Sequence, residues 1–560
     1  MMKKTFKQLL GLTLSAAMVI GMAGCGNDTP TNNTETQVVS KETETTAAKE
    51  SETQVVEEEG VTYPLTSDES ITMWTQRFTL NDDYSHWSES PVHTGVNERI
   101  GMNIDYMFPQ KGQNVNEAFN LLLTEDVLPD VIHKAVTLQQ LQEYYEDGII
   151  YDLTPYLEKY APDYWSYLTA EGHEEMYRQA ATSDGKLLAF WGLRELPSWS
   201  ITYIGPMIRQ DWLDECGLQA PVTLEDWETV LTAFKEKYNA TFGFASTYLR
   251  YELLASGTGA HATGVVDNSL RAYYVDDDGV VQSSVHQPEW VEYIKIMNRW
   301  YENGLIDVDS MTMDANTLRT KAANNQIGAS WGPMSQLTNF TTDVEANNSD
   351  ADWVGISYPR TAPGEPTVST QYGSPIITSA AFITTSCPEE KLIEVIKALN
   401  YGYTEEGMTY FNFGELGVSY TIDSEGKEQW TDLILNDPQG LNSAVTKYTV
   451  AHTCPIGIQL NRHGQMKNSD AAVAAVDAWV ENTKVQEHYL LVMELTEEEQ
   501  AVYTDKYVAI ATYINEMTQK YIMGVEDIDN VDAFYAQLEK MGMQECLEIQ
   551  RAAYARYLTK

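Results

Sequence analysis

The sequence predicts an α/β fold that ends in a helical region, and three patterns support this prediction. Short apolar runs alternate with amphipathic helices from about Tyr63 onward. Two of these runs flank a helix in strand–helix–strand order, which is typical of a parallel sheet. After about Asp470 strand-like runs disappear and the pattern is almost wholly helical. We therefore expect a parallel-stranded body with extra helices after it.

The first three strands are predicted at Ile71–Trp74, Asn103–Phe108 and Asp130–His133, which are short runs rich in apolar residues. The helix between the second and third runs begins after Asn114, with Glu117 three residues on as a capping pair. Its apolar face is formed by Val115, Phe119 and Leu122.

Later helices are predicted from their start and stop signals. One begins at Thr223–Asp226, a second begins at Pro288 and ends at Gly304, a third begins at Ser386–Glu389, and Thr496–Glu499 marks a fourth. The inward residues of the first three are Trp227, Val230, Leu231 and Phe234; Trp290, Ile294, Met297 and Tyr301; and Leu392, Val395, Ile396 and Leu399.

The first residues predict export and lipid attachment. Lys3, Lys4 and Lys7 precede the apolar run Leu9–Met22, which is too short to span a bilayer comfortably. The run ends in Met22-Ala23-Gly24-Cys25, which resembles the lipobox of bacterial lipoproteins. We expect residues 1–24 to be a signal peptide and Cys25 to carry the lipid. A soluble secreted protein cleaved near Ala23 is the alternative.

Residues 25–62 are predicted to form the lipidated N-terminus and a disordered tether. Gly26–Gly60 is rich in Thr and Glu, with few apolar residues and no aromatic ones, so it cannot bury enough surface to offset the entropy of ordering. No second apolar stretch of spanning length follows. The rest of the chain is therefore expected on the extracytoplasmic face of the cell membrane, held by its anchor.

Charge and cysteine content narrow the possible partners. The formal net charge of −46 argues against nucleic acid or anionic lipid headgroups, which require a positive surface. The remaining cysteines, Cys216, Cys387, Cys454 and Cys546, form no CxxC pair, so neither a zinc site nor a disulfide scaffold is indicated. The sequence is compatible with a single disulfide bond among these cysteines. We expect no cofactor and a monomer.

Two motifs invite a catalytic or metal-binding interpretation. Gly328–Gly332 matches the G-x-S-x-G pattern of a nucleophile elbow, but the residues from Pro333 onward do not predict the required helix. His452 or His463 could be nominated as the base, although nothing positions either. Asp276–Gly279 lacks the ligand spacing of a calcium loop and is predicted to be a hairpin turn. Whether calcium binds the chain stays open.

Several segments occur in an order that resembles a known family. They are Ile71–Thr75, Leu128–Val131, Asp147–Thr154, Ser183–Phe190, Arg209–Asp214 with Pro221–Trp227, Gly304–Asp307, Ile327–Trp331 and Phe534–Tyr557. This set is similar to the extracellular solute-binding proteins of bacterial carbohydrate ABC importers, of the family 1 type and its long lipoprotein subgroup. The resemblance covers essentially Tyr63 to Lys560.

The resemblance implies a two-lobed periplasmic-binding-protein-like fold with a hinge and extra C-terminal helices. Lobe one would comprise residues 63–203 and 377–436, and lobe two residues 204–376. Helices within residues 437–560 would pack back across the hinge. A sugar would lie in the cleft between the lobes, and the closed form would present both lobes to a permease.

Candidate ligand-binding residues come from strand ends and from the chemistry of sugars. Sugar rings stack on aromatic side chains, and their hydroxyl groups need planar donors and acceptors. Trp74, Trp191, Trp331 and Tyr372 each follow a predicted strand, and ligands bind at the carboxyl ends of strands in open α/β sheets. The polar candidates are Gln76, Arg77, Asp130 and Arg209, with Asn412 and Glu415 in a loop that reaches the cleft in this family. Core, solvated or capping roles are the alternatives for each.

These observations favour a lipid-anchored, non-catalytic binding protein that captures a carbohydrate, expected to be an oligosaccharide, and delivers it to an ABC transporter permease. A cell-surface glycoside hydrolase is the alternative from another class, because acidic residues are too numerous to exclude a catalytic pair. A binding protein for peptides or another polar solute is the third hypothesis.

Overall fold

Two β-sheets organise the chain. The computed structural model describes residues 60–76, 86–110, 112–199, 201–248, 254–261, 272–347, 349–451, 456–490 and 493–560. Met1–Thr62 and Tyr63–Lys560 form separate units, and the account below concerns the second. Cys25, Arg77, His452 and Cys454 lie outside the described residues. Among the described residues, no helix has the length and apolar content that crossing a membrane requires.

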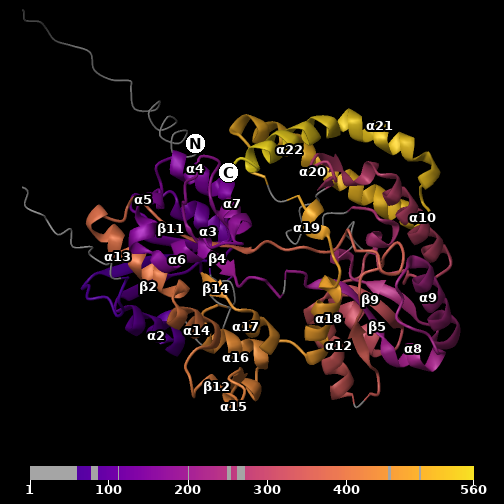
Figure 1. Cartoon of the computed structure of the whole chain (residues 1–560), viewed down its shortest axis with the longest axis horizontal. Helices are drawn as coiled ribbons and strands as arrows, with labels where there is room; N and C mark the ends of the chain where they lie inside the picture. The colour runs from indigo at the N-terminus through magenta and orange to yellow at the C-terminus, as the bar shows by residue number, and fades with distance from the viewer. Residues whose placement is uncertain are drawn as a thin grey trace, which may run out of the picture. The chain divides into compact units, whose positions relative to one another are not determined.

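The first sheet has six strands in the order β14-β4-β11-β3-β1-β2 (Figure 1). The predicted parallel pairing is confirmed, because β1 runs parallel to both β2 and β3. Strand β11 runs antiparallel to its neighbours β3 and β4. The strands are β1 (Ser70–Thr75), β2 (Asn103–Met107), β3 (Val131–Lys134), β4 (Phe190–Arg194), β11 (Ile376–Ile383) and β14 (Gly457–Gln459).

The second sheet has four strands in the order β10-β5-β9-β6. Strand β6 runs parallel to β9, whereas β5 runs antiparallel to β9 and β10. The strands are β5 (Ile204–Arg209), β6 (Thr241–Phe244), β9 (Ile327–Pro333) and β10 (Trp353–Gly355). Two hairpins stand apart from the sheets: β7 (Tyr273–Val275) with β8 (Val281–Ser283), and β12 (Tyr420–Ile422) with β13 (Glu428–Trp430). The first confirms the predicted turn at Asp276–Gly279.

Helices connect and cover these strands. Those before β5 are α2 (Pro91–Ile100), α3 (Val115–Leu122), α4 (Leu138–Glu146), α5 (Thr154–Tyr160), α6 (Pro162–Leu168) and α7 (Glu174–Ala180). Those up to β11 are α8 (Gln210–Cys216), α9 (Leu224–Tyr238), α10 (Pro288–Glu302), α11 (Ala315–Ala323) and α12 (Met334–Ala346). The later ones are α13 (Glu389–Asn400), α14 (Glu405–Phe413), α15 (Asp432–Leu435), α16 (Leu441–Tyr448), α17 (Asn461–Met466), α18 (Asp470–Val480), α19 (Val485–His488), α20 (Glu497–Ile522), α21 (Val531–Met541) and α22 (Met543–Tyr557).

Most of the predicted helix starts are confirmed, and one is wrong. Asn114 caps α3, Pro288 begins α10, and Thr223–Asp226 and Thr496–Glu499 form reciprocal capping boxes at α9 and α20. Helix α13 instead begins after Pro388 without a side-chain cap. Ser386 was expected to cap it, but its Oγ accepts a hydrogen bond of 3.0 Å from the Leu128 backbone N–H. On α10, Tyr301 is half-buried and Trp300 takes the fully buried position.

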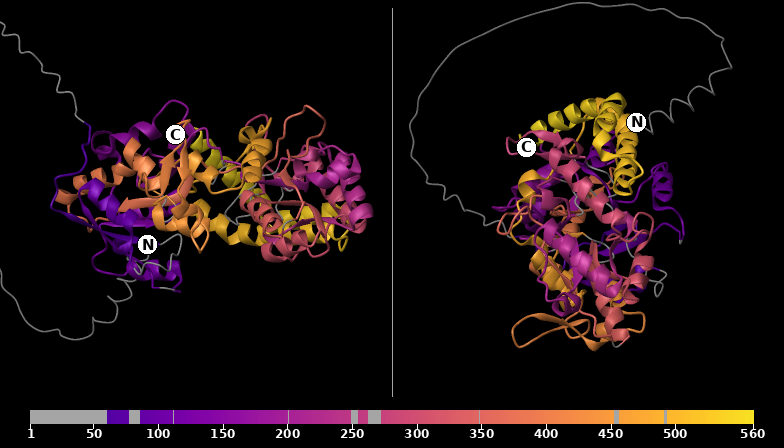
Figure 2. Two further views of the ribbon diagram at one scale, coloured as in Figure 1. Left: turned by 90° about the horizontal axis from the view of Figure 1, so that it is seen from below. Right: turned by 90° about the vertical axis from the view of Figure 1, so that its right-hand side faces the viewer.

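Each sheet has its own apolar core, and these cores define what we call the first and second lobes. The core around the first sheet runs from Ile71 to Ile458 in sequence and includes Phe190 and Phe382. The core around the second sheet includes Trp227 and Trp331 and extends into α18 and α20–α22. Helix α20 of the C-terminal region, coloured yellow in Figures 1 and 2, contacts α10. Strand β14 joins the first sheet although only helices are predicted for residues 437–560.

Candidate ligand-binding site

The carboxyl ends of the parallel strands define one edge of each sheet. In the first lobe β1, β3, β4 and β14 end at this edge and the antiparallel β11 begins there. In the second lobe β6, β9 and β10 end at the equivalent edge and β5 begins there. The chain leaves β4 at Arg194 and enters β5 at Ile204, so one short connection joins the two carboxyl edges. Ligands bind at such edges in open α/β sheets.

A second connection runs beside the first. The Arg194 N–H donates to the Pro375 carbonyl (3.0 Å), and the Gly373 N–H donates to the Ile201 carbonyl (2.7 Å). The Tyr203 N–H donates to Oε1 of Gln371 (2.7 Å). We call residues 195–203 and 367–375 the crossing segments. Together they carry the chain between the lobes at the edge where a ligand is expected.

Several of the buried polar atoms without a partner lie on the crossing segments. Within the described residues, Trp199 Nε1, Thr370 Oγ1 and Gln371 Nε2 are buried and make no hydrogen bond. An unpaired buried donor costs about 1–3 kcal/mol, so native proteins seldom keep several together without a function. A hydroxyl-rich ligand could partner these groups. The crossing segments are therefore the strongest candidate for ligand contacts.

Two cationic side chains lie beside the crossing segments. Arg194 Nε donates to the Ser374 carbonyl (3.1 Å), and burial lowers its pKa. Burial, with a smaller effect of the Arg194 charge, lowers the pKa of Lys467 to about 8. Arg194 and Lys467 therefore lie close enough for their charges to interact.

Trp74 lies inside β1, one residue before its carboxyl end and not after the strand, whereas Gln76 follows β1 at the carboxyl edge of the first sheet. Trp74 is buried and packs on Phe119, with ring centroids 5.7 Å apart. Gln76 is half-buried, and its Oε1 accepts a hydrogen bond of 2.8 Å from the Ala135 N–H. Beside them His133 is enclosed between Thr75 Oγ1 (3.0 Å) and Ser379 Oγ (2.7 Å), and burial lowers its pKa to about 3.

Asp130 and Arg209 do not lie at the carboxyl edges. Asp130 precedes β3, and its Oδ2 accepts hydrogen bonds from Thr72 N and Oγ1 (both 2.7 Å) and from Lys391 Nζ (2.8 Å). Arg209 ends the antiparallel β5, so it lies at the amino edge of the second sheet. Both side chains are buried in ion pairs that hold the fold together.

Trp191 and Trp331 lie inside strands rather than after them. Trp191 is the second residue of β4, is 3% exposed, and accepts a hydrogen bond at its carbonyl from the Tyr403 hydroxyl (2.6 Å). Trp331 is fully buried in β9 and meets Tyr358 edge to face at 5.1 Å. Both rings form part of the apolar cores, which was the alternative role considered for them.

The remaining candidates have different positions. Tyr372 lies on a crossing segment, half-buried against Tyr489 at 5.0 Å, and burial raises its pKa to about 12. Asn412 lies in α14 and not in the predicted loop; it is fully buried, and its Nδ2 donates to the Ile458 carbonyl of β14 (2.7 Å). Glu415 is exposed and pairs with Arg99 (2.6 Å). Arg77 lies outside the described residues.

The sequence did not predict Trp199, Thr370, Gln371 or Lys467 as site residues. One usable signal existed for Trp199. The predicted strand ended at Phe190, whereas β4 continues to Arg194, so the aromatic residue that follows this strand is Trp199 and not Trp191.

The G-x-S-x-G motif at Gly328–Gly332 differs from the prediction in one respect, because a helix does follow it. Helix α12 does follow β9 directly, at Met334, although no helix was predicted there. Ser330, however, is fully buried inside the strand, and its hydroxyl donates to the Gly243 carbonyl (2.6 Å). His463 is also fully buried. Ser330 is therefore not presented as a nucleophile.

Comparisons with known proteins were made on sequence and on structure, and no family model matches the chain. It is 27% identical over 283 residues to the fructooligosaccharide ABC transporter substrate-binding protein FusA of Streptococcus pneumoniae, covering 48% of this chain and 51% of FusA. It is 23% identical over 313 residues to the lipoprotein LipO of Bacillus subtilis, covering 55% of this chain and 59% of LipO. The chain thus spans about half the length of the curated relatives it matches.

Solved structures match over most of the chain. An HMO-binding, ABC-transporter-associated solute-binding protein from Bifidobacterium longum infantis superposes with a TM-score of 0.71 at 17% identity, covering 88% of this chain and 99% of that one. The alginate-binding protein AlgQ2 gives a TM-score of 0.66 at 22% identity, with the same coverage. The chain has the fold of the extracellular solute-binding proteins. The predicted α/β, periplasmic-binding-protein-like fold and the predicted resemblance to this family are confirmed.

Proposed function

We propose that this chain is the solute-binding protein of an ABC importer and that it captures an oligosaccharide without chemical conversion. The observation that carries the proposal is the match of both lobes to a saccharide-binding protein over 88% of the chain. The FusA relative, whose name refers to fructooligosaccharides, supports the same class of ligand. The unpaired polar atoms of the crossing segments would receive the sugar hydroxyl groups.

Binding and turnover separate this proposal from a surface glycoside hydrolase. The protein is incubated with fructooligosaccharides, alginate oligosaccharides and a wider glycan panel, while its melting temperature and the product sugars are measured. A binding protein gains about 2.7 kcal/mol of unfolding free energy when the ligand is at one hundred times its Kd. Thermal stabilisation without product supports the proposal. Product formation, or stabilisation by peptides alone, contradicts it.

We further propose that the protein acts as a monomer on the outer face of the cell membrane, attached through a lipid on Cys25 beside its permease. LipO, a relative of similar sequence, is named a lipoprotein. Tethering would raise the effective concentration of the loaded protein at the permease. Replacing Cys25 with alanine is expected to release the protein into the medium with its ligand affinity unchanged. A changed affinity of the released protein would contradict the separation of anchor and site.

A further inference from the structure

The C-terminal helices contact the two lobes in chemically different ways. Towards the second lobe they share its apolar core, to which Tyr507, Ile514, Phe534 and Leu547 all belong. The core of the first lobe includes no described residue after Ile458. An apolar interface of this kind cannot separate without exposing its surface to water, at about 25 cal/mol per Å². Helices α20–α22 are therefore a fixed part of the second lobe.

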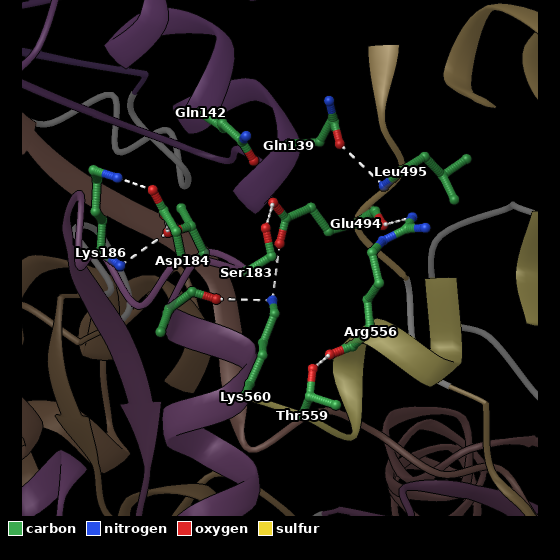
Figure 3. A network of polar contacts seen from close by, with 12 residues as sticks. Gln139, Gln142, Ser183, Asp184, Lys186, Glu494, Leu495, Arg556, Thr559 and Lys560 are labelled. Atoms are coloured by element: carbon green, nitrogen blue, oxygen red, sulfur yellow. Dashed lines mark hydrogen bonds and ion pairs between the residues drawn. The ribbon is translucent and has the colours of Figure 1, made fainter. Parts of the chain in front are cut away.

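Towards the first lobe this region makes polar contacts (Figure 3). Ser183 Oγ donates to Oε1 of Glu494 (3.2 Å), and Lys560 Nζ donates to the Ala181 carbonyl (2.9 Å). The Leu495 N–H donates to Oε1 of Gln139 (3.2 Å). Water can replace a polar contact at little net cost, so these contacts can form and break. We call them, with the Tyr557–Glu175 bond described below, the latch.

An ion pair lies at the centre of the latch. Lys560 Nζ is 2.9 Å from Oε2 of Glu494, and the two side chains are only 5% and 11% exposed. Arg556 supports the pair, because its Nη2 donates to the Glu494 carbonyl (3.3 Å). A buried ion pair requires good geometry and further hydrogen bonds to offset desolvation. Here the Ala181 carbonyl and the Ser183 hydroxyl of the first lobe supply those bonds.

Hydrogen bonds connect the latch to a crossing segment. The Tyr557 hydroxyl donates to Oε1 of Glu175 (2.5 Å), and Gln179 Nε2 donates to the same oxygen (2.9 Å). Gln179 Oε1 accepts from Ser374 Oγ (2.5 Å) on the crossing segment. Burial, followed by the charge of Glu175, raises the pKa of the Tyr557 hydroxyl, so it stays a donor. A movement of the crossing segment would therefore change the hydrogen bond between Tyr557 and Glu175.

We propose that the latch forms when the carboxyl edges of the two lobes approach, and that it strengthens ligand binding by stabilising this closed arrangement. Gln139 follows β3 at the carboxyl edge of the first sheet, so its bond to Leu495 requires that edge to lie close to the second lobe. A contact made only in the closed state shifts the population towards it. The effect on affinity rests on the proposed function, whereas the effect on lobe position does not.

The test compares Lys560→Met and Tyr557→Phe with the control Lys540→Met, which changes an exposed lysine on α21. Full-length protein with Cys25→Ala is used, and saccharide Kd values are measured by calorimetry. We expect about a tenfold weaker Kd for Lys560→Met, about a threefold weaker Kd for Tyr557→Phe, and no change for the control. An unchanged Kd for both variants, or a tighter one, would overturn the proposal.

Lobe position is measured separately and without ligand. Spin labels are placed at Glu158 on α5 and Glu236 on α9, both exposed, in protein whose Cys216 and Cys454 are changed to serine. Lys560→Met is expected to shift the distance distribution towards longer separations, and an unchanged distribution would overturn the latch even if no saccharide binds. If Lys560→Met unfolds, the same shift of the distance distribution is expected for Tyr557→Phe, and its absence would overturn the latch. If the distances shift but the wild type binds no saccharide, the proposed function fails and the latch stands.

Discussion

The amino and carboxyl edges of the two sheets differ in how their polar groups are satisfied. At the amino edges Asp130 and Arg209 are buried, and both are paired with an opposite charge and with neutral partners. At the carboxyl edges, the crossing segments bury Trp199 Nε1 and Gln371 Nε2 without a partner among the described residues. Satisfied charges stabilise a fold, whereas unsatisfied groups cost stability and are retained for another purpose. The comparison agrees with a stabilising role for the amino-edge ion pairs and with the ligand contacts proposed for the crossing segments.

One of the two largest effects is expected for Asp130→Ala. This change leaves the Lys391 ammonium, whose side chain is 12% exposed, without its carboxylate, so the unfolding free energy should fall by about 3 kcal/mol. The double variant Asp130→Ala/Lys391→Met should recover a substantial part of this loss, because it removes the unpaired charge. Urea unfolding measures both.

The matched control is Glu394→Gln, in the more exposed pair Glu394–Lys397 of the same lobe. Its unfolding free energy should change by less than about 1 kcal/mol. Saccharide affinity of folded Asp130→Ala should equal that of the wild type. A weaker affinity would indicate that Asp130 contributes to the ligand site, and it would contradict the purely stabilising role given to the amino edge.

Arg209→Met tests the amino edge of the second sheet. Arg209 donates to both carboxylate oxygens of Asp211 and, through Nη1, to Asn325 Oδ1 (2.6 Å), with 5% of its side chain exposed. Its loss should lower the unfolding free energy by about 3 kcal/mol without weakening ligand binding. Arg319→Met removes the more exposed pair with Asp343 and should cost about 1 kcal/mol or less. Equal losses in the two variants would contradict the role given to burial.

The pH dependence gives a smaller effect with a defined sign. Burial acts to raise the pKa of Asp130, but hydrogen bonds from Lys391 and Thr72 outweigh it and hold the pKa below its usual value of 3.8. A carboxyl group with a lowered pKa stabilises the fold above its unfolded pKa, and this stabilisation is lost as the pH falls through the folded pKa. The unfolding free energy should therefore fall as the pH drops below about 4. The fall should be shallower in Asp130→Ala, and equal slopes would exclude this group as a contributor.

The sequence predicts the elements of this fold better than it predicts their edges. The parallel pairing of β1 with β2 and β3, and the capping boxes of α9 and α20, follow from local patterns and are confirmed. Whether a polar residue next to a strand lies at the carboxyl or the amino edge depends on strand direction. Arg209 ends a strand, where a ligand-binding residue is expected in a parallel sheet, but β5 is antiparallel to its neighbours, and no local pattern predicts that reversal.

Strand length limits the prediction of the site in a similar way. Trp191 was predicted to follow a strand, yet β4 extends from Phe190 to Arg194 and places Trp191 in the core. Thr370 and Gln371 lie in a segment that has no apolar periodicity. They become candidates only because the other crossing segment, residues 195–203, is distant in sequence and adjacent in space. Contacts of this kind follow from the tertiary fold and not from local sequence.

Trp199→Phe is the smallest change and the most direct test of the carboxyl edge. It keeps an aromatic ring on the crossing segment and removes the buried Nε1–H that lacks a partner. No hydrogen bond is lost within the described residues, and the relief of an unpaired donor offsets the packing lost with the smaller ring, so the unfolding free energy should fall by no more than about 0.5 kcal/mol. If Nε1 serves a sugar hydroxyl, the Kd measured by calorimetry should rise by about fivefold to tenfold. An unchanged Kd combined with a clear loss of stability would reverse the assignment, because Trp199 would then serve the fold as Asp130 does.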